Sequence, residues 1–275
     1  MAQKDWLKSL LVRLTSSTQA QALLEGSVVF AHQLMGIGSG SSPCWSGENT
    51  LRRVLERQRA ISGKPVCIFD VGSNTGQFIA SVLMPLENAG IATEIHAFEP
   101  SPVAFKTLQD TFGGRLNVYL NNFGLSDETR KVELFSDRPG SGLASLSRRR
   151  LDHFGIEFEA AETVQLRVLD DYCRERNVQH IDLLKLDVEG HELDVLRGAK
   201  RLFQEKRISI ASFEFGGCNI DSRTFVQDFW YFFRQNGGGR LHRLSPSGSL
   251  VPIPEYREDL EQFRNTIFVV LQADA

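Results

Sequence analysis

The residue types best suited to chemistry are concentrated after two apolar segments. The first segment, Val66–Val71, is followed by a turn that contains Gly72, Ser73, Asn74 and Gly76. An apolar strand, a glycine-containing turn and a helix in this order are typical of nucleotide-binding folds. A dinucleotide fingerprint has a further glycine that lets the backbone approach a pyrophosphate. Because Asn74 stands between the two glycines here, the turn does not favour a pyrophosphate.

Asp70 is a second argument against a phosphate-bearing ligand. A carboxylate at the end of the strand would repel phosphate groups and attract a cation. S-adenosylmethionine carries an ammonium and a sulfonium and no phosphate, so it suits this turn better than NAD does. The sequence therefore disfavours an NAD-linked oxidoreductase. A tight turn that only connects a strand to a helix is the alternative that assigns no ligand.

Glu99 follows the next apolar segment, residues 94–98. An acidic residue about 20 positions beyond the glycine turn is typical of a carboxylate that binds ribose hydroxyls. Glu99 could instead cap the following helix. Asn122 and Phe123 come after the third segment, residues 116–121, where an amide and an aromatic ring could contact and stack on an adenine. Asparagines at strand ends are also ordinary turn residues.

The second cluster lies in and after Ile181–Leu186. Strand alternation places Lys185 and Asp187 on one face, together with Glu189 if the strand continues that far. Two carboxylates and a lysine at the end of an apolar strand are costly unless they pair with each other or bind a ligand. His191 adds a potential base at the start of the next helix. A structural ion-pair network around Lys185 is the alternative interpretation.

Glu214 follows the fifth segment, residues 208–213, and is either a charge at the rim of the core or part of an acceptor pocket. Transfer of a methyl group from a sulfonium requires the protein to align an acceptor, take up its proton and exclude water. The candidate catalytic residues are Lys185, Asp187, Glu189, His191 and Glu214. Three of them, Asp187, Glu189 and Glu214, could alternatively hold a divalent cation, although their spacing does not require one.

The elements that must position these residues alternate between strand and helix from Val66 onward, which is typical of a parallel sheet covered on both faces. Strands are predicted at Val66–Val71, 94–98, 116–121, Ile181–Leu186 and 208–213, and helices at Gln77–Asn88, Pro102–Phe112, 193–204 and 223–235. Segments 131–135 and 163–168 are predicted to be strands of an insertion. The chain continues with a hairpin of Arg240–Leu244 and 250–253 and a buried strand at Thr266–Leu271.

The first 47 residues are predicted to form a helical extension. Apolar residues recur at helical spacing from Trp6 to Leu14, a second helix is predicted from Ser17 toward Met35, and residues 48–59 suggest a third helix. The extension could pack on the rest of the chain or on a second copy, which would make a homo-oligomer. The alternative is a basic amphipathic helix that touches a membrane surface or covers a substrate.

Bulk composition narrows the functional classes. With 31 Lys and Arg against 34 Asp and Glu, the net charge of −3 gives no basic excess for nucleic acid. No apolar stretch approaches the about 20 residues of a membrane span, and no signal-peptide pattern is present, so a soluble cytoplasmic protein is expected. The cysteines, Cys44, Cys67, Cys173 and Cys218, show no paired spacing and are expected to be small buried residues.

Several motifs occur in a fixed order: FDVGSNTG at 69–76, FEPS at 98–101, LSD at 125–127, VLDDY at 168–172, DLLKLDVEGHE at 182–192, LRGA at 196–199 and FE at 213–214. In these motifs the sequence resembles the FkbM family of S-adenosylmethionine-dependent class I methyltransferases. The likeness covers most of residues 66–271. The candidate cofactor-binding residues are Asp70, Gly72, Ser73, Asn74, Gly76, Phe98, Glu99, Asn122, Phe123 and Asp187.

The resemblance implies an α/β fold, a Rossmann-like three-layer sandwich with a mostly parallel seven-stranded sheet whose last strand is antiparallel, over residues 48–275. It also implies methyl transfer to a hydroxyl of a sugar, glycan or secondary metabolite. His191 lies at a position regarded as variable in the family. A cofactor-binding protein that acts through interaction, with the extension as its docking surface, is the alternative.

A glycine- and serine-rich segment, residues 140–145, is followed by Arg148, Arg149 and Arg150. One interpretation is a loop that closes over the acceptor and whose arginines attract an anionic one. The other is an ordinary solvated loop.

Overall fold

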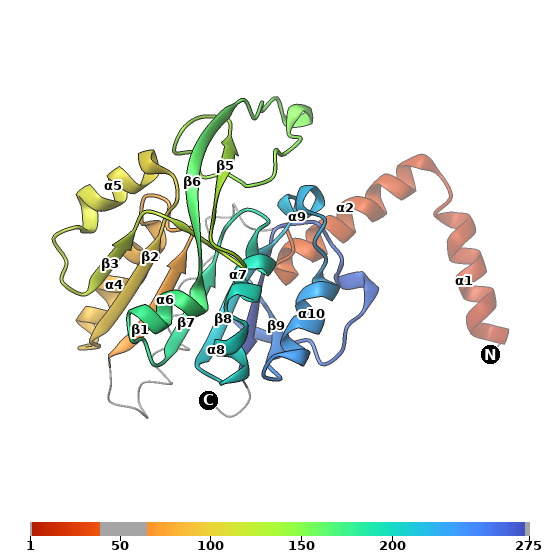
Figure 1. Ribbon diagram of the computed structural model, residues 1–275. Helices are drawn as coiled ribbons and strands as arrows, with labels where there is room; N and C mark the ends of the chain where they lie inside the picture. The colour runs from red at the N-terminus through yellow and green to blue at the C-terminus, as the bar shows by residue number, and fades with distance from the viewer. Residues whose placement is uncertain (1, 39–64, 273–275) are drawn as a thin grey trace.

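The computed structural model describes residues 2–38 and 65–272 (Figure 1). The predicted helix at 48–59, Cys44 and the predicted domain boundary after residue 47 lie outside these residues. The other cysteines, Cys67, Cys173 and Cys218, are buried thiols as predicted.

An eight-stranded sheet forms the centre of the molecule, in the order β10-β9-β11-β8-β7-β1-β2-β3. Its strands are β1 (Val66–Val71), β2 (Thr93–Phe98), β3 (Val118–Asn121), β7 (Ile181–Leu186), β8 (Ile208–Phe215), β9 (Arg240–Leu244), β10 (Leu250–Pro252) and β11 (Thr266–Leu271). β1, β2, β3, β7 and β8 are parallel, and β11 runs antiparallel to both β8 and β9. The predicted fold class is confirmed. The sheet has one strand more than the seven expected, because β10 extends it as the hairpin partner of β9.

Helices cover both faces of the sheet, which makes three layers (Figure 1). They are α4 (Gln77–Asn88) and α5 (Pro102–Phe112) on one face and α6 (Leu169–Glu175), α7 (Glu192–Gly198), α8 (Lys200–Gln204) and α10 (Val226–Gln235) on the other. In β1, Phe69 and Val71 pack with the second group and Ile68 with the first. A strand with both faces covered is apolar throughout, and β1 is buried at every residue.

Several elements differ from the predictions; the strand predicted at 116–121, for example, begins at Val118. The predicted helix at 193–204 is two helices, α7 and α8, and Gly198 at their junction lies so close to β4 that an added Cβ would be 2.0 Å from the Ser126 carbonyl oxygen. α10 begins at Val226 rather than at residue 223, because Arg223 has a left-handed φ of 59° that ends the short helix α9 (Cys218–Ser222). α6 was not predicted, because its turn of helix directly continues a strand.

A second, three-stranded sheet rises beside the carboxyl ends of β1 and β7 (Figure 1). It consists of β4 (Gly124–Ser126), β6 (Ala160–Val168) and β5 (Arg130–Ser136), in that order. β5 and β6 confirm the predicted insertion. The connection between them includes a 3₁₀ turn at Asp152–Phe154.

The structure has helices α1 (Ala2–Leu14) and α2 (Thr18–Met35) where the spacing of apolar residues predicts them, and both project away from the sheet (Figure 1). No residue of α2 is buried. The chain meets the domain just after this helix, where Ile37 is buried and the Gly38 N–H donates to the Asn265 carbonyl over 2.8 Å. Within residues 2–38 and 65–272, no helix is both long and apolar enough to cross a membrane.

Candidate active site

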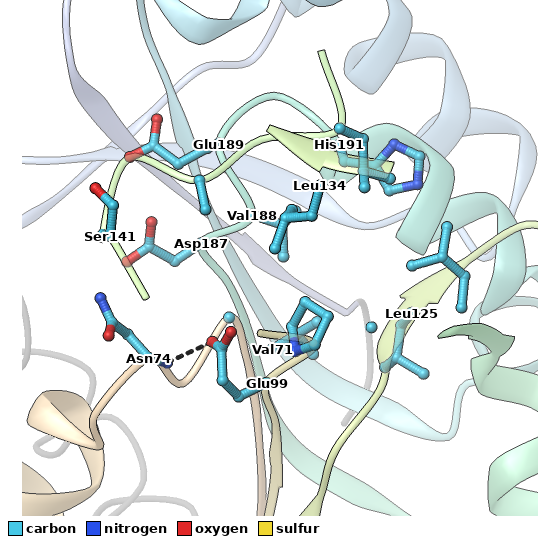
Figure 2. A pocket seen from close by; sticks show the side chains of 17 residues that line it. Val71, Asn74, Glu99, Leu125, Leu134, Ser141, Asp187, Val188, Glu189 and His191 are labelled. Carbon is cyan, nitrogen blue, oxygen red and sulfur yellow. Dashed lines mark hydrogen bonds between the residues drawn. The ribbon is translucent and has the colours of Figure 1, made fainter. Parts of the chain in front are cut away.

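A pocket opens at the carboxyl ends of β1, β2 and β7, below the β5–β6 connection (Figure 2). The chain leaves β1 and β7 on opposite sides of the sheet, and ligands of open α/β sheets bind at such a point. The polar residues that line it are Asn74, Glu99, Ser141, Asp187, Glu189 and His191. Asn74, Ser141, Asp187 and Glu189 lie toward one end, and Leu125 and His191 lie toward the other.

The β1–α4 turn approaches the β7–α7 turn very closely. Gly72 has a φ of 81°, and a Cβ added to it would lie 1.8 Å from the Asp187 carbonyl oxygen. Any side chain at this position would therefore push the two turns apart. Asn74 also has a left-handed φ, of 47°, which asparagine tolerates better than most residues. Gly72 is thus explained by packing between the two turns as well as by access for a ligand.

Asp70 and Lys185 form an ion pair beneath the pocket. The Lys185 Nζ lies 2.9 Å from Asp70 Oδ1 and 3.4 Å from Asp187 Oδ2. Burial alone would lower the pKa of Lys185, but the two carboxylates raise it above its ordinary value. Lys185 is therefore held as a cation and does not act as a base. These contacts match the alternative interpretation of the sequence, a structural ion-pair network around Lys185. Neither Lys185 nor Asp70 lines the pocket.

Glu99 lines the pocket, and each of its carboxylate oxygens accepts one backbone hydrogen bond. Its Oε2 accepts the Asn74 N–H over 2.8 Å, drawn as a dashed line in Figure 2, and its Oε1 accepts the Ser101 N–H over 2.9 Å. A carboxylate has about four acceptor positions, so two remain for the hydroxyls of a ribose. Burial raises the pKa of Glu99 to about 7, and the two backbone donors act in the opposite direction.

The pocket also has an apolar lining, made by Leu125, Leu134, Leu146, Leu166 and Val188. Leu125 lies toward the end opposite the carboxylates, as does His191 (Figure 2). Most of these residues come from the small sheet and the connection above it, so the insertion supplies the apolar surface on which an adenine ring would lie. Asn74 Oδ1, at the polar end, is buried and has no hydrogen-bond partner among the described residues. An unsatisfied buried acceptor of this kind is suited to a ligand donor such as an ammonium.

Asp187 and Glu189 follow β7 at the polar end. The Asp187 side chain is 42% exposed, and Glu189 accepts a 2.6 Å ion-pair contact from Arg149 Nη1. Burial raises the pKa of Glu189 to about 7, although Arg149 opposes this shift. A carboxylate with such a pKa is well suited to take up a proton near neutral pH.

The histidine of this turn has both ring nitrogens engaged. His191 Nδ1 lies 3.1 Å from Asp194 Oδ2, and its Nε2 lies 3.0 Å from Ser126 Oγ. The ring thus joins α7 to β4 at the end of the pocket opposite the carboxylates. This placement favours a structural role over the catalytic role predicted for His191.

Glu214, at the end of β8, does not line the pocket. Burial, followed by the nearby carboxylates of Asp187, Glu189 and Glu192, raises the pKa of Glu214 to about 8. Among the described residues, no group of three or more His, Cys, Asp or Glu side chains is arranged to hold a metal ion. The alternative metal set of Asp187, Glu189 and Glu214 is therefore not assembled.

The structure does not bring several other predicted cofactor residues to the pocket. Ser73 donates from its Oγ to the Asp70 carbonyl over 2.8 Å, and Gly76 packs on Phe112. Phe98 and Phe123 pack edge to face against each other in the aromatic core. The exposed Asn122 side chain donates to the Glu99 and Pro100 carbonyls. The adenine role predicted for Asn122 and Phe123 thus has no support in this geometry.

The apolar residues of β5 and β6 that line the pocket carry no sequence signal for this role, because the pattern of their strands indicates only an insertion. The glycine- and serine-rich segment was expected beside the site, and Ser141, Gly142 and Ala144 line the pocket. Arg149 was considered only as an attractor of anionic acceptors. Its side chain is 9% exposed and is occupied by Glu189, so it does not present a charge to solvent.

The charge of the pocket distinguishes between ligand classes. Three carboxylates line it, and no lysine or arginine is found among the described residues that do so. A phosphate-bearing cofactor would find no cation there, whereas a ligand with an ammonium, a sulfonium and a ribose would find carboxylates. The residues present therefore fit S-adenosylmethionine, and they fit a dinucleotide poorly.

Comparison with known proteins agrees with this conclusion. The model of the Methyltransferase FkbM domain family matches residues 70–241. The chain is 28% identical over 150 residues to the 2-O-methyltransferase NoeI of Sinorhizobium fredii, a match that covers 51% of this chain and 60% of NoeI. It is 31% identical over 158 residues to the 31-O-demethyl-FK506 methyltransferase FkbM of Streptomyces tacrolimicus, covering 48% and 59% of the two chains. The match thus spans about three fifths of each of these relatives.

Among solved structures, the chain is similar to a methyltransferase FkbM from Methylobacillus flagellatus KT. The TM-score is 0.47 at 15% sequence identity, and the match covers 75% of this chain and 43% of the other. The family match extends over more than half of the chain and includes the β1–α4 turn, Glu99 and the β7–α7 turn. The chain therefore belongs to the Methyltransferase FkbM domain family.

Proposed function

We propose that the protein is an S-adenosylmethionine-dependent O-methyltransferase whose acceptor is a hydroxyl of a sugar, a glycan or a secondary metabolite. The observation that carries this proposal is the pocket itself, which has carboxylates at one end, an apolar lining and no cationic side chain among its described lining residues. The names of both curated relatives, a 2-O-methyltransferase and a 31-O-demethyl-FK506 methyltransferase, support oxygen as the acceptor atom.

Each part of the pocket has a proposed binding role. Glu99 would hold the ribose hydroxyls, and the leucines from the small sheet would cover the adenine. Asn74 Oδ1 and Asp187 would bind the ammonium at the polar end. The bound cofactor supplies an electrophilic methyl group on a sulfonium. The remaining task of the protein is to orient an acceptor, remove its proton and exclude water.

Glu189 is the proposed base. Its carboxylate lines the pocket beside Asp187 and has a pKa of about 7. The acceptor O–H would give its proton to Glu189, the oxygen would form a bond to the methyl carbon, and the C–S electron pair would remain on sulfur. The competing candidates are less suitable, since Lys185 is ion-paired, His191 is bound at both ring nitrogens and Glu214 lies outside the pocket.

The test has a binding arm and a transfer arm. In calorimetry, S-adenosylhomocysteine should bind and NAD should not. With labelled S-adenosylmethionine, hydroxylated acceptors and fractions of lysate are then screened for label transfer, and Glu189→Gln should lower its rate by about 10²- to 10⁴-fold. Glu157→Gln, at an exposed glutamate of the β5–β6 connection, is the matched control. If neither S-adenosyl compound binds, the proposal is wrong.

The second candidate is an interaction protein that binds the cofactor without transferring its methyl group. The observation that favours it is the apolar surface of the N-terminal helices, where Trp6, Leu23, Phe30 and Leu34 are each more than 60% exposed. Cofactor binding without transfer to any acceptor or lysate fraction would support this second candidate over the first.

A further inference from the structure

Arg149 is unusual among the arginines of the β5–β6 connection. Its side chain is only 9% exposed, whereas its neighbours Arg148 and Arg150 are exposed residues. Removing a guanidinium from water is costly unless a partner compensates for the lost hydration. The contacts of Arg149 therefore indicate which part of the molecule the β5–β6 connection binds.

Those contacts converge on Glu189. Arg149 Nη1 lies 2.6 Å from Glu189 Oε2, and Ser145, four residues earlier in the same connection, donates its Oγ to the Glu189 carbonyl over 2.7 Å. The connection thus holds one residue of the β7–α7 turn by its side chain and by its main chain. Glu189 has a left-handed φ of 50°, a conformation that a residue with a side chain keeps only when its surroundings impose it.

The same connection covers the pocket. Ser141, Gly142 and Ala144 line it from above, and a bridge between Phe135 and Ser145 closes the base of this segment. The segment that shields the pocket is therefore the segment that carries Arg149.

The charges around Glu189 explain why a cation is needed there. Asp187 faces it from its own turn, and Glu214 faces it from the end of β8. Burial and the Asp187 carboxylate raise the pKa of Glu189, and Glu189 in turn raises the pKa of Glu214. Arg149 is the group that acts in the opposite direction, and Asp221 of α9 lies behind it, 3.8 Å from Arg149 Nε.

We propose that Arg149 is a positioning residue for methyl transfer, which fixes the ionised Glu189 carboxylate at the polar end of the pocket and ties the β5–β6 connection down over it. The catalytic part of this inference, that Arg149 positions Glu189 for methyl transfer, rests on the proposed function. The tie between the connection and the β7–α7 turn stands on the contacts alone.

The kinetic test uses four single variants and one double variant. Arg149→Met should lower kcat by about 10- to 100-fold, since small misplacements of a reacting group have effects of this size. Arg149→Lys keeps the charge and should recover part of the loss, and Arg150→Met, its exposed neighbour, should leave kcat unchanged. Because Arg149 acts through Glu189, the double variant Arg149→Met/Glu189→Gln should lose no more than Glu189→Gln alone.

A pH profile separates positioning from a general structural defect. The acid limb of kcat reflects loss of the ionised base as pH falls. Removing the guanidinium raises the pKa of Glu189, so Arg149→Met should move this limb upward by about 1–3 pH units. A variant that is only less well folded would have a lower kcat at every pH, without a shift of the acid limb.

Hydrogen exchange supplies a readout that needs no acceptor. Amides of residues 137–149 should exchange faster in Arg149→Met than in the wild type or in Arg150→Met. Unchanged exchange together with an unshifted acid limb would overturn the proposal, as would multiplicative losses in the double variant. If the wild type transfers no methyl group at all, the proposed function fails, and so does the catalytic role of Arg149. The hydrogen-exchange result still decides whether Arg149 holds the β5–β6 connection against the β7–α7 turn.

Discussion

At the residue scale, Glu99 differs from the other carboxylates of the pocket because backbone N–H groups hold both of its oxygens. The donors come from Asn74, in the β1–α4 turn, and from Ser101, at the start of α5. These contacts fix the orientation of the carboxylate before any ligand arrives. Pre-organisation of this kind lowers the cost of binding a pair of hydroxyls.

Glu99→Gln should therefore weaken S-adenosylhomocysteine binding. Hydrogen bonds to a charged group contribute about 1.5–3 kcal/mol, so we expect a loss of affinity of roughly 10- to 100-fold by calorimetry. The amide also presents an N–H₂ group to a backbone donor, which disturbs the turn. Glu157→Gln is the control, and unchanged affinity in Glu99→Gln would exclude the ribose role.

At the element scale, the pocket depends on the contact between the β1–α4 and β7–α7 turns. The first turn is kept close by the absence of a side chain at Gly72. The second is organised by Glu192, whose Oε1 accepts the N–H groups of Val188 and Gly190, each over 3.1 Å. Asp187 and Glu189 are carried by that turn, so its shape determines where both carboxylates lie.

Gly72→Ala should separate the two turns and abolish cofactor binding. The left-handed φ by itself costs about 1–2 kcal/mol with an alanine, and the clash with the Asp187 carbonyl adds to this. Gly90→Ala is the matched control, since Gly90 has a φ of 67° and nothing within 4 Å of an added Cβ. Thermal unfolding and calorimetry should show a smaller stability loss and intact binding for Gly90→Ala. Equal effects of the two substitutions would contradict the role of the contact.

Glu192 also predicts a dependence of stability on pH. Its side chain is buried, its Oε2 has no partner among the described residues, and burial raises its pKa from 4.5 to about 7. The folded protein therefore holds this proton more tightly than the unfolded chain does. The resulting stability is fully present below pH 4.5 and is lost as pH rises through 7.

The isosteric variant Glu192→Gln isolates this contribution. From pH 4.5 to about 8, the wild type should lose roughly 3 kcal/mol of unfolding free energy that the variant keeps. Denaturant unfolding at several pH values measures the difference. Parallel pH curves for the two proteins would show that Glu192 ionises normally in the fold.

At the scale of the whole molecule, the N-terminal helices stand apart from the domain. α2 presents Leu23, Phe30 and Leu34 at spacings of seven and four residues, which places them on one face of the helix. All three are more than 60% exposed. An exposed apolar stripe of this kind is typical of an interaction surface. Self-association through these helices stays a prediction.

Leu23→Glu/Phe30→Glu in the full chain tests that prediction. If the helices join two copies, the wild type should sediment as an oligomer and the double variant as a monomer, because two charges are placed in the contact. Gln21→Glu/Ala31→Glu adds the same charge at exposed positions of α2 away from this stripe and should leave association intact. A monomeric wild type would rule out a homo-oligomer through these helices.

The sequence by itself determined the alternation of strand and helix and the two clusters at strand ends. These features are local, since hydrophobic periodicity and glycine turns act within a few residues of each other. Gln77–Asn88, Pro102–Phe112 and β1 have the predicted boundaries for this reason. The cationic ligand was predicted from Asp70, which the fold pairs with Lys185 outside the pocket.

Only the tertiary structure decided which members of each cluster reach the pocket. Lys185 pairs with Asp70, 115 positions away, and Arg149 pairs with Glu189, 40 positions away. β5, β6 and their connection became walls of the pocket because the small sheet lies beside the carboxyl ends of β1 and β7 (Figure 1). Such pairings depend on how elements far apart in the chain meet, and no local pattern of charge or hydrophobicity records that.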